Sequence, residues 1–177
     1  MASKELKIST ARYVGLAGIR ILPVKPVITI EESLDKELAH VLEAHWLFCT
    51  SASPIEFVFA LDASKLFTPD ITVFGARVLG ELVSVGAIRR LDTDHAELKS
   101  MHTLAKSRGN GISKAIVAHI EDFARAQGFK RISLETGTTE HFKPARGLYK
   151  TLGYKECEAF GEYAPNDYST FMTKFIS

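Results

Sequence analysis

Apolar residues recur every three to four positions between Ile112 and Gln127, while charged residues lie elsewhere around the helical wheel. Gly128 follows, at the position where a left-handed residue usually ends a helix. The pattern therefore predicts an amphipathic helix that buries one face. The predicted apolar face consists of Ile112, Ala115, Ile116, Ile120, Phe123, Ala124 and Gln127.

Segments typical of strands precede and follow this helix. Strands are predicted at residues 71–78, 82–90 and 96–104, and a short strand at 131–135 follows the helix directly. The helix and its two neighbouring strands form one βαβ unit, whose strands should be parallel and whose crossover should be right-handed. Regular alternation would place Leu98, Ser100 and His102 on one face of the strand 96–104, and Glu97, Lys99, Met101 and Thr103 on the other.

The segments before residue 71 are less regular. We expect a strand at 27–30 and a helix that begins at Ser33. Its apolar face would contain Leu34, Leu38, Val41, Leu42, His45 and Trp46. Residues 49–69 are predicted to form a loop with a short helical piece at 57–66, and this loop is either tucked onto the surface or a lid over an acceptor pocket.

The last third of the chain predicts one more helix and two strands. The helix carries Pro144 in its first turn and ends at Gly153, and the strands follow at 154–159 and 169–175. No internal repeat or interdomain linker interrupts this order. The sequence thus predicts one α/β (α+β) domain at residues 27–177, preceded by an N-terminal extension, 1–26, that is an appended strand or a partly ordered arm.

Composition narrows the function classes. A length of 177 residues with 46% hydrophobic and 24% charged residues describes one soluble globular domain. The formal net charge of +1 gives no general attraction to nucleic acid or to an anionic membrane, and no apolar run approaches the ~18–20 residues of a membrane span. Cys49, Cys157 and the six histidines show no metal-ligand spacing, so we expect a cytoplasmic protein with free thiols and no metal.

A glycine-rich loop opens the central helix. Gly109 and Gly111 bracket Asn110, and such residues allow the dihedral angles that turn backbone N–H groups toward one point. Together with Arg108 and the positive end of the helix dipole, the loop predicts a phosphate cradle, although an ordinary strand-to-helix turn would read the same way. A P-loop is excluded because no Gly-Lys-Ser/Thr follows, and Lys114 replaces the last glycine of a dinucleotide fingerprint.

Two motifs carry a resemblance to a known family. Residues Arg108 to Ser113 match R-x-x-G-x-[G/A], with Ser113 in place of the usual last residue, and ARGLYKTLGY matches A-x-x-L-Y-x-x-x-G-[FY]. The second match rests on Ala145, Leu148, Tyr149, Gly153 and Tyr154. Over residues 27–177 the chain resembles the GNAT N-acetyltransferase superfamily, and in particular its small, mostly bacterial members of undefined substrate.

The resemblance implies a fold and a co-substrate. The fold is a mixed central sheet whose two central parallel strands splay apart, flanked by helices, and the co-substrate is acetyl-CoA without a metal. Its pantetheine arm would pair with the backbone of the strand before the loop and approach Tyr149, and its pyrophosphate would bind the loop amides. The implied cofactor-binding residues are Met101, His102, Thr103, Arg108, Gly109, Asn110, Gly111, Ile112, Ser113 and Tyr149.

The resemblance also implies the reacting groups. An amine must be neutral to attack a thioester, the oxyanion needs a donor, and the leaving thiolate needs a proton. Tyr149 is the implied general acid, with an alkaline limb near its ordinary pKa of about 10, and a backbone N–H near Met101 to Thr103 is the oxyanion donor. Glu97 or Glu135 is the candidate base, with water or His102 as alternatives. Glu56, Glu135, Tyr163 and Asp167 form an acceptor wall suited to a cationic amine.

The expected function is acetyl-CoA-dependent N-acetylation of a small primary amine by direct transfer in a ternary complex. A non-catalytic acyl-CoA sensor, an acetyltransferase of a protein N-terminus or lysine, and an acyl carrier at Cys157 or Cys49 are the alternatives. Phe142 stands where the family often has a cofactor-binding Asn, so Thr136 or Thr138 would replace that contact. In this family terminal strands often meet across a homodimer.

Overall fold

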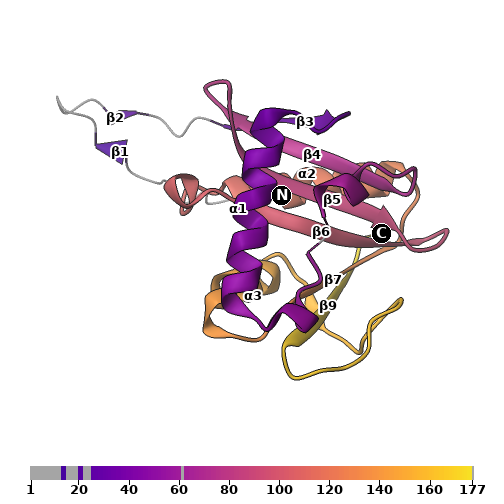
Figure 1. Cartoon of the computed structure of the whole chain (residues 1–177). Coiled ribbons are helices and arrows are strands. Elements are labelled where there is room, and N and C mark those ends of the chain that lie inside the picture. The colour runs from indigo at the N-terminus through magenta and orange to yellow at the C-terminus, as the bar shows by residue number, and fades with distance from the viewer. Residues whose placement is uncertain (1–12, 15–19, 22–24, 61, 177) are drawn as a thin grey trace, which may run out of the picture.

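The computed structural model describes residues 13–14, 20–21, 25–60 and 62–176. Within this part of the chain, a seven-stranded mixed sheet has the order β3-β4-β5-β6-β7-β9-β8, and helices cover both of its faces (Figure 1). The strands of this sheet are β3 (Val27–Glu31), β4 (Ile71–Val78), β5 (Glu81–Arg90), β6 (His95–Thr103), β7 (Arg131–Gly137), β8 (Lys155–Glu156) and β9 (Ser169–Phe175). The expected α/β class is confirmed.

Three α-helices and four short 3₁₀ helices connect the described strands. Their bounds are α1 (Lys36–Ala52), η1 (Ile55–Phe57), η2 (Ala63–Leu66), η3 (Ala105–Ser107), α2 (Ile112–Ala126), η4 (Glu140–Phe142) and α3 (Lys143–Thr151). No helix in this part of the chain is long and apolar enough to cross a membrane. Before β3, the two-residue strands β1 (Tyr13–Val14) and β2 (Arg20–Ile21) pair with each other. The rest of the predicted extension, 1–26, lies mostly outside the described residues.

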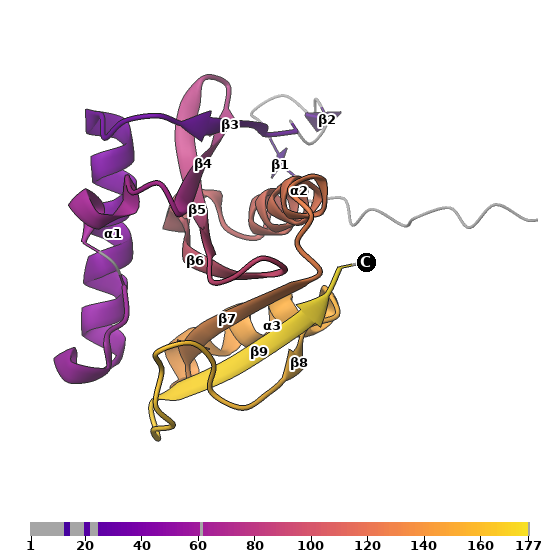
Figure 2. The same ribbon diagram turned by 90° about the vertical axis from the view of Figure 1, so that its right-hand side faces the viewer.

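The two central strands pair over a short distance only. Strands β6 and β7 are parallel, as predicted, and His95, Ala96 and Glu97 pair with Arg131, Ile132 and Ser133. Beyond these three pairs the strands diverge, and the half with β7, β9 and β8 turns away from the half with β3 to β6 (Figure 2). The splayed central strands that the resemblance implied are therefore present.

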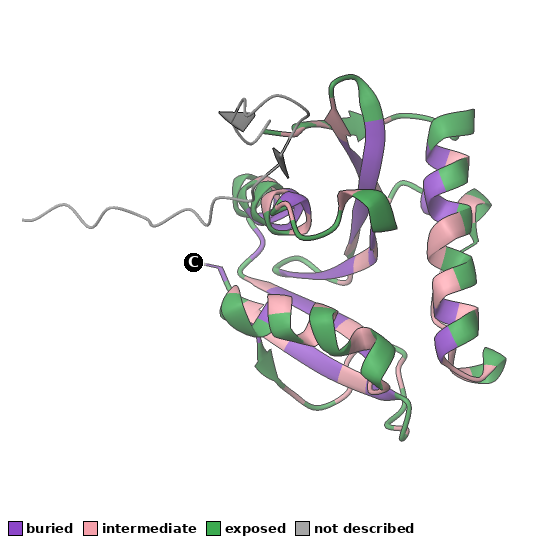
Figure 3. Cartoon of the chain, turned by 90° about the vertical axis from the view of Figure 1, so that its left-hand side faces the viewer, coloured by how far each residue is buried: buried purple, intermediate pink, exposed green. Residues whose placement is uncertain are grey.

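Two apolar clusters hold the layers together. On one side of the sheet, α2 packs through Ile116 and Ile120, and the same cluster continues to Leu134, Tyr149 and Met172, so it joins the two halves. On the other side, α1 packs through Leu38 and Val41 on the first half of the sheet only. Figure 2 shows α1 and α2 on opposite sides of this half, and Figure 3 shows their buried stripes.

Helix α1 differs from its prediction at both ends. Asp35, and not Ser33, caps its first turn by accepting a hydrogen bond from the Leu38 amide at 2.8 Å. The helix continues through residues 49–52, which were expected to be loop. In this last turn the hydroxyls of Thr50 and Ser51 donate to the carbonyls of Trp46 and Phe48, at 2.9 Å each. Leu34 and Trp46, predicted to be apolar-face residues, are 44% and 41% exposed.

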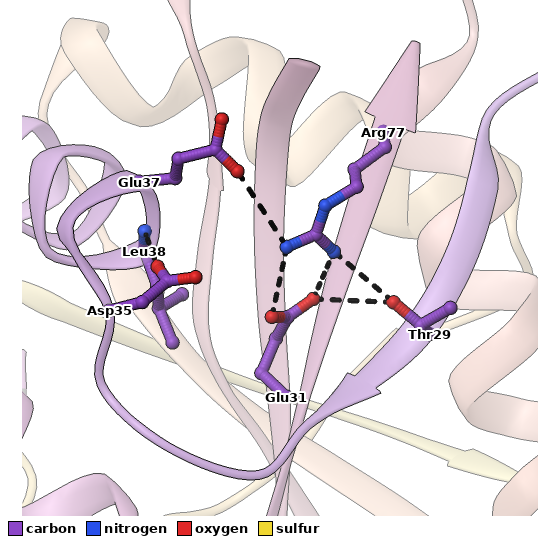
Figure 4. Close-up of polar contacts among 6 residues, drawn as sticks. All are labelled: Thr29, Glu31, Asp35, Glu37, Leu38 and Arg77. Atoms are coloured by element: carbon purple, nitrogen blue, oxygen red, sulfur yellow. Dashed lines mark hydrogen bonds and ion pairs between the residues drawn. The ribbon is translucent and has the colours of Figure 1, made fainter. Parts of the chain in front are cut away.

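A charged cluster fixes the connection between β3 and α1 (Figure 4). Arg77 on β4 donates from both terminal nitrogens to Glu31 at the end of β3, whose side chain is 8% exposed. The guanidinium also lies 3.9 Å from Glu37 in the first turn of α1. A Cβ at Gly75 would lie 2.1 Å from the Glu31 carboxylate, so a larger residue there would force this carboxylate to shift. The cluster therefore ties the end of β3 to β4, beside the first turn of α1.

The predicted termini of the later elements are mostly confirmed. Helix α2 ends before Gly128, whose φ is +87°, and α3 carries a proline in its first turn. Strand β9 has its predicted bounds, whereas the strand predicted at 154–159 is reduced to Lys155–Glu156. Beyond β8, residues 158–168 turn back over the face of β7 and β9, where Tyr163 contacts Phe171 at 5.5 Å between ring centroids.

Candidate active site

A cavity of about 550 Å³ opens where β6 and β7 diverge. Its walls come from the C-terminal half of α1, the segment 57–60, β6, the loop before α2, β7, α3 and Tyr163. The cavity brings together most of the residues predicted for the site. These are Glu97, Met101, His102, Thr103, Arg108, Gly109, Gly111, Ile112, Ser113, Glu135, Tyr149 and Tyr163.

The glycine-rich loop has the geometry of an anion cradle. Gly109 and Gly111 both have φ of +77°, and a Cβ on either would meet no heavy atom within 4 Å. Gly111 occupies the N-cap of α2 and provides no side-chain cap, so the first amides of the helix are not satisfied by a capping side chain. The Asn110 side chain bonds back to the Ser107 and Arg108 carbonyls, at 3.3 and 3.2 Å, and closes the turn. These features fit a bound pyrophosphate.

A chain of hydroxyl groups ties this loop to β6. Ser113, the unusual last residue of the motif, lies 2.8 Å from the Thr103 hydroxyl, which in turn lies 2.8 Å from that of Ser84. Ser84 donates to the His102 carbonyl at 2.7 Å, and Arg108 Nε donates to the Thr103 carbonyl at 2.9 Å. A serine at the last motif position therefore fixes the loop against the strand. It also follows that the Thr103 carbonyl already accepts a bond from Arg108.

A β-bulge in β6 corrects the predicted faces of this strand. Ser100 has φ of +53°, and the pairing with β5 shifts register between Val85 and Ala87. The extra residue reverses the alternation, so Met101 joins Leu98 in the cluster under α2, and His102 faces α1. A Cβ at Gly86 would lie 2.4 Å from the Met101 sulfur, so the bulge is accommodated by a glycine on β5.

Glu97 is held by two partners on the α1 side of the sheet. Its carboxylate is 2% exposed and accepts a hydrogen bond from Lys99 Nζ at 2.9 Å and a second one from the Tyr163 hydroxyl. Lys99 Nζ also donates to the Tyr163 oxygen at 2.7 Å. Lys99 had not been named as a site residue, although its place two positions after Glu97 on one strand face is the signal that could have found it.

Glu135 lies across the cavity on β7. Burial raises the pKa of Glu135 to about 7, although the hydrogen bond from Ser169, at 2.7 Å, and the positive charge of Lys99 lower it. Unlike Glu97, it forms no ion pair with any described residue. Its carboxylate can therefore exchange a proton near neutral pH within the cavity.

Tyr149 projects from α3 into the same space. It is 6% exposed, its ring lies 5.7 Å from that of Tyr154, and its hydroxyl has no hydrogen-bond partner within the described chain. Burial, and then the charge of Glu135, raise the pKa of Tyr149 above its ordinary value. The hydroxyl therefore stays protonated at neutral pH, as a proton donor must.

Aromatic side chains and two neutral imidazoles line the wall beside α1. Phe142 packs over Gly137, where a Cβ would lie 2.3 Å from its ring, and contacts Phe48 at 5.2 Å between ring centroids. The ring centroids of His45 and His102 lie 5.5 Å apart. Burial lowers the pKa of His45 to about 3 and that of His102 to about 4. Because a base with a pKa of about 4 is weak, His102 is a poor alternative to Glu135.

Four predicted residues lie elsewhere. Glu56 and Asp167 are exposed and are not in the cavity wall, so of the four residues expected in the acceptor wall only Glu135 and Tyr163 line the cavity. Asn110 closes the loop without lining the cavity, and Thr138 donates to the Asp167 carbonyl at 2.8 Å. Of the two threonines considered as replacements for the family's Asn, only Thr136 lines the cavity.

Neither thiol has the lowered pKa that an acyl carrier needs. Cys49 lines the cavity, but burial, followed by the charge of Glu135, raises its pKa to about 12. Burial also raises the pKa of Cys157. A nucleophilic cysteine needs the opposite shift, because the thiolate is the reactive form. Among the described residues, no group of three or more His, Cys, Asp or Glu side chains could hold a metal ion.

Comparisons with known proteins agree with this geometry. The model of the acetyltransferase (GNAT) family matches residues 38–154. The chain is 39% identical over 147 residues to the uncharacterized N-acetyltransferase YsnE of Bacillus subtilis, which covers 83% of this chain and 97% of the relative.

Solved structures show the same fold. A candidate acyl-CoA N-acyltransferase from Klebsiella pneumoniae superimposes with a TM-score of 0.71 at 25% identity, over 86% of this chain and 98% of that one. A GNAT acetyltransferase from Elizabethkingia anophelis with acetyl-CoA bound superimposes with a TM-score of 0.63 at 14% identity, over 85% and 98%. The family model spans more than half of this chain, and the match to YsnE covers nearly all of that relative. This protein is therefore an acyltransferase that belongs to the GNAT acetyltransferase family.

Proposed function

We propose that the protein transfers the acetyl group of acetyl-CoA to a small primary amine, directly and within a ternary complex. One observation carries the proposal: a carboxylate whose pKa is about 7 and a protonated tyrosine line one cavity that ends at an anion cradle. An amine acetyltransferase needs a proton acceptor, a proton donor and a site for the nucleotide.

The residues around the loop fit acetyl-CoA. The amides of Gly109 to Ser113 would bind the pyrophosphate, and the cationic side chains of Arg108 and Lys114 stand at the same end of the cavity. The edge of β6 that does not pair with β7 would accompany the pantetheine arm between the diverging strands. Acetyl-CoA supplies the acetyl group as a thioester, whose leaving group is a thiolate. A bound structural neighbour, the Elizabethkingia acetyltransferase, supports this assignment.

The proton transfers are assigned to two side chains. Glu135 accepts one proton from the ammonium group and passes it to solvent, so that the neutral nitrogen can attack the thioester carbonyl and form the C–N bond. Tyr149 donates its proton to the sulfur as the C–S bond breaks, and the tyrosinate takes up the second proton that the nitrogen loses as it becomes an amide. Backbone N–H groups next to the bulge would stabilise the oxyanion between the two steps.

Glu135 is a better base than Glu97 because it is not neutralised. The Glu97 carboxylate is bonded to a lysine ammonium and a phenol, so a proton on it would cost those bonds. Glu135 carries one hydroxyl donor and a pKa close to physiological pH, where a general base is most effective. The proposal therefore assigns the base to Glu135 and not to Glu97.

The test combines binding with turnover. Coenzyme A binding is measured by calorimetry, and thiol release from acetyl-CoA is followed with a panel of primary amines at several concentrations of both substrates. We expect intersecting lines in double-reciprocal plots, because both substrates must be bound together, and kcat/KM should rise as pH increases through about 7. Parallel lines would indicate an acyl-enzyme, and tight binding without amine-dependent release would indicate a sensor.

A further inference from the structure

We call the part of the cavity that is lined by Glu97, Lys99, Glu135, Tyr163 and residues 57–59 its acceptor half. This half contains a buried cation that the proposed chemistry does not use. Lys99 lies on β6 with a side chain that is 8% exposed, and it lines the cavity between Glu97 and the bulge. Its ammonium group is held by Glu97 and Tyr163 at 2.9 and 2.7 Å. A lysine this deep in a substrate cavity is uncommon, since lysine is almost never buried without a partner.

The hydrogen bonds of Lys99 are incomplete. An ammonium group has three protons to donate, and only two acceptors in the described chain are within bonding distance. A buried donor of a charged group that stays unpaired costs free energy. An anionic oxygen brought in by the acceptor would satisfy the third N–H and would be bound by a charge-assisted hydrogen bond.

The charges in this half of the cavity favour an acceptor that carries both an amine and a negatively charged group. Glu97 is engaged by Lys99 and Tyr163, so Glu135 is the carboxylate left to receive an amine. Lys99 and Glu135 both line this cavity, and the positive charge of Lys99 lowers the pKa of Glu135. An acceptor whose amine approaches Glu135 could therefore place a neighbouring anionic group on Lys99.

Part of the cavity wall next to Tyr163 is apolar. Phe57, Val58 and Phe59 line it, and the Phe59 ring meets that of Tyr163 edge-on at 5.1 Å between centroids. A side chain that fills this space would bury apolar surface, whereas a polycationic amine would find only one free carboxylate. This wall argues against the cationic acceptor that the sequence suggested.

We propose that the acceptor is an amino acid with an apolar or aromatic side chain, and that Lys99 binds its carboxylate. The inference rests on the proposed N-acetylation, because the same molecule must present its amine to Glu135. It makes Lys99 a specificity-determining residue for the acceptor. The acceptor's carboxylate would add a bond to the ammonium without displacing Glu97 or Tyr163.

Matched pairs of ligands isolate the carboxylate. Phenylalanine, tryptophan and leucine are titrated by calorimetry into protein saturated with coenzyme A, beside phenethylamine, tryptamine and 3-methylbutylamine. In at least one pair the amino acid should bind about ten-fold or more tightly, the scale of one charge-assisted hydrogen bond. Equal binding within every pair, or no binding of any amino acid, would overturn the inference.

Two variants assign the preference to Lys99. Lys99→Met alone would leave Glu97 as a buried unpaired charge and could unfold the chain, so the double variant Lys99→Met/Glu97→Gln removes both charges together. Its preference for the amino acid should fall to near one, while Lys99→Arg, which keeps the positive charge, should retain it. A preference that survives in the double variant would show that Lys99 only neutralises Glu97.

Thiol release with the same ligands separates this inference from the proposed function. Amino acids that bind through Lys99 but are not acetylated would leave the Lys99 assignment standing and remove the N-acetylation. Acetylation of the decarboxylated amines at equal or higher kcat/KM would keep the N-acetylation and remove the Lys99 assignment.

Discussion

At the scale of single residues, burial has opposite chemical results for the two side chains that face the reacting atoms. It raises the pKa of Glu135 to about 7, which turns an ordinary carboxylate into a base that works near neutrality. It also raises the pKa of Tyr149, which keeps the phenol protonated. Removal from water therefore makes Glu135 a stronger base, whereas it leaves Tyr149 protonated, as its ordinary pKa already would, and makes it a weaker acid.

Tyr149→Phe tests the donor. The change removes one hydroxyl and keeps the ring, so turnover should fall by roughly 10²–10⁴ while acetyl-CoA affinity stays within a few-fold. Tyr154→Phe is the matched control, since Tyr154 is also buried and contacts Tyr149 but does not line the cavity. Steady-state kinetics and calorimetry compare the two variants. A Tyr149→Phe enzyme as fast as the Tyr154→Phe enzyme would leave the thiolate to be protonated by solvent.

The raised pKa also changes an expectation for pH dependence. A tyrosine with its ordinary pKa would produce an alkaline limb near pH 10. Because the pKa of Tyr149 lies higher, its limb moves out of the range in which the protein can be assayed. Turnover should therefore rise as pH increases through the pKa of Glu135 and should then stay constant up to pH 10.

Ser100 tests the strain in the bulge. A non-glycine residue with φ of +53° costs about 1–2 kcal/mol, and its buried hydroxyl has no hydrogen-bond partner in the described chain. Ser100→Gly should therefore raise the free energy of unfolding by about 1 kcal/mol, after the greater entropy of an unfolded glycine is subtracted. Ser100→Ala removes the hydroxyl alone. Its free energy of unfolding, measured with urea, should lie between those of the parent and of Ser100→Gly. A destabilised glycine variant would show that the bulge is not strained.

At the scale of elements, regular periodicity was the reliable part of the sequence. It gave α2, β4, β7 and β9 within a few residues, since α2 buries one amphipathic face and each of the three strands contains a buried apolar stretch. Single-residue irregularities left no comparable signal. The bulge at Ser100 reversed the faces of the residues that follow it, and this exchanged the predicted surroundings of Met101 and His102.

The candidate site was predictable only where local sequence determines it. The glycine loop and Tyr149 were found because turn geometry and motif spacing are properties of neighbouring residues. Contacts between distant segments were not found. The pairing of Lys99 with Tyr163 and the exposure of Glu56 depend on how the segments 57–60 and 158–168 fold over the sheet, which no local pattern encodes.

The glycine at the start of α2 provides a prediction with an internal control. Gly111 and Gly128 lie at opposite ends of this helix, both have positive φ, and neither would meet a neighbour with its Cβ. Valine at either position should cost similar stability, about 1–2 kcal/mol, because β-branched residues resist positive φ. Only Gly111→Val should also weaken coenzyme A binding, by about ten-fold or more, since its side chain would enter the space before the helix amides. Equal affinities by calorimetry would remove the cradle.

At the scale of the whole molecule, the cavity exists because the two halves of the sheet are joined on one side only. Three residue pairs connect β6 to β7, and a buried chain of hydrogen bonds runs beside them from Arg131 through His95 and Ser133 to Thr173, with distances of 2.8, 2.7 and 2.9 Å. The cluster under α2 and α3 spans both halves, whereas the cluster under α1 belongs to the first half. The opening therefore follows from the way the strands pair and pack, and the burial of polar side chains along it lowers the stability of the folded state.

That cost should be visible as a dependence of stability on pH. The folded chain keeps a proton on Glu135 up to about pH 7, whereas the unfolded chain releases it near 4.5. Between these values the folded state binds more protons, so this group's contribution to stability is fully present below about pH 4.5 and is lost as pH rises through about 7. At 1.36 kcal/mol per unit of pKa, the loss is up to about 3 kcal/mol.

Glu135→Gln should remove that loss, because the neutral amide can still accept the Ser169 hydrogen bond. We expect the variant to gain stability relative to the parent as pH rises from 5 to 8, in urea unfolding at each pH. The difference between the two proteins is the quantity to follow, since the lowered pKa values of His45 and His102 make both proteins more stable as pH rises toward 6.5.

Glu140→Gln is the control, because Glu140 is exposed and its pKa is already lowered by Lys143. A stability gain that comes with a loss of turnover would show that the chain keeps a destabilising carboxylate for its chemistry, whereas a difference that does not change with pH would return Glu135 to an ordinary pKa and remove it as the base.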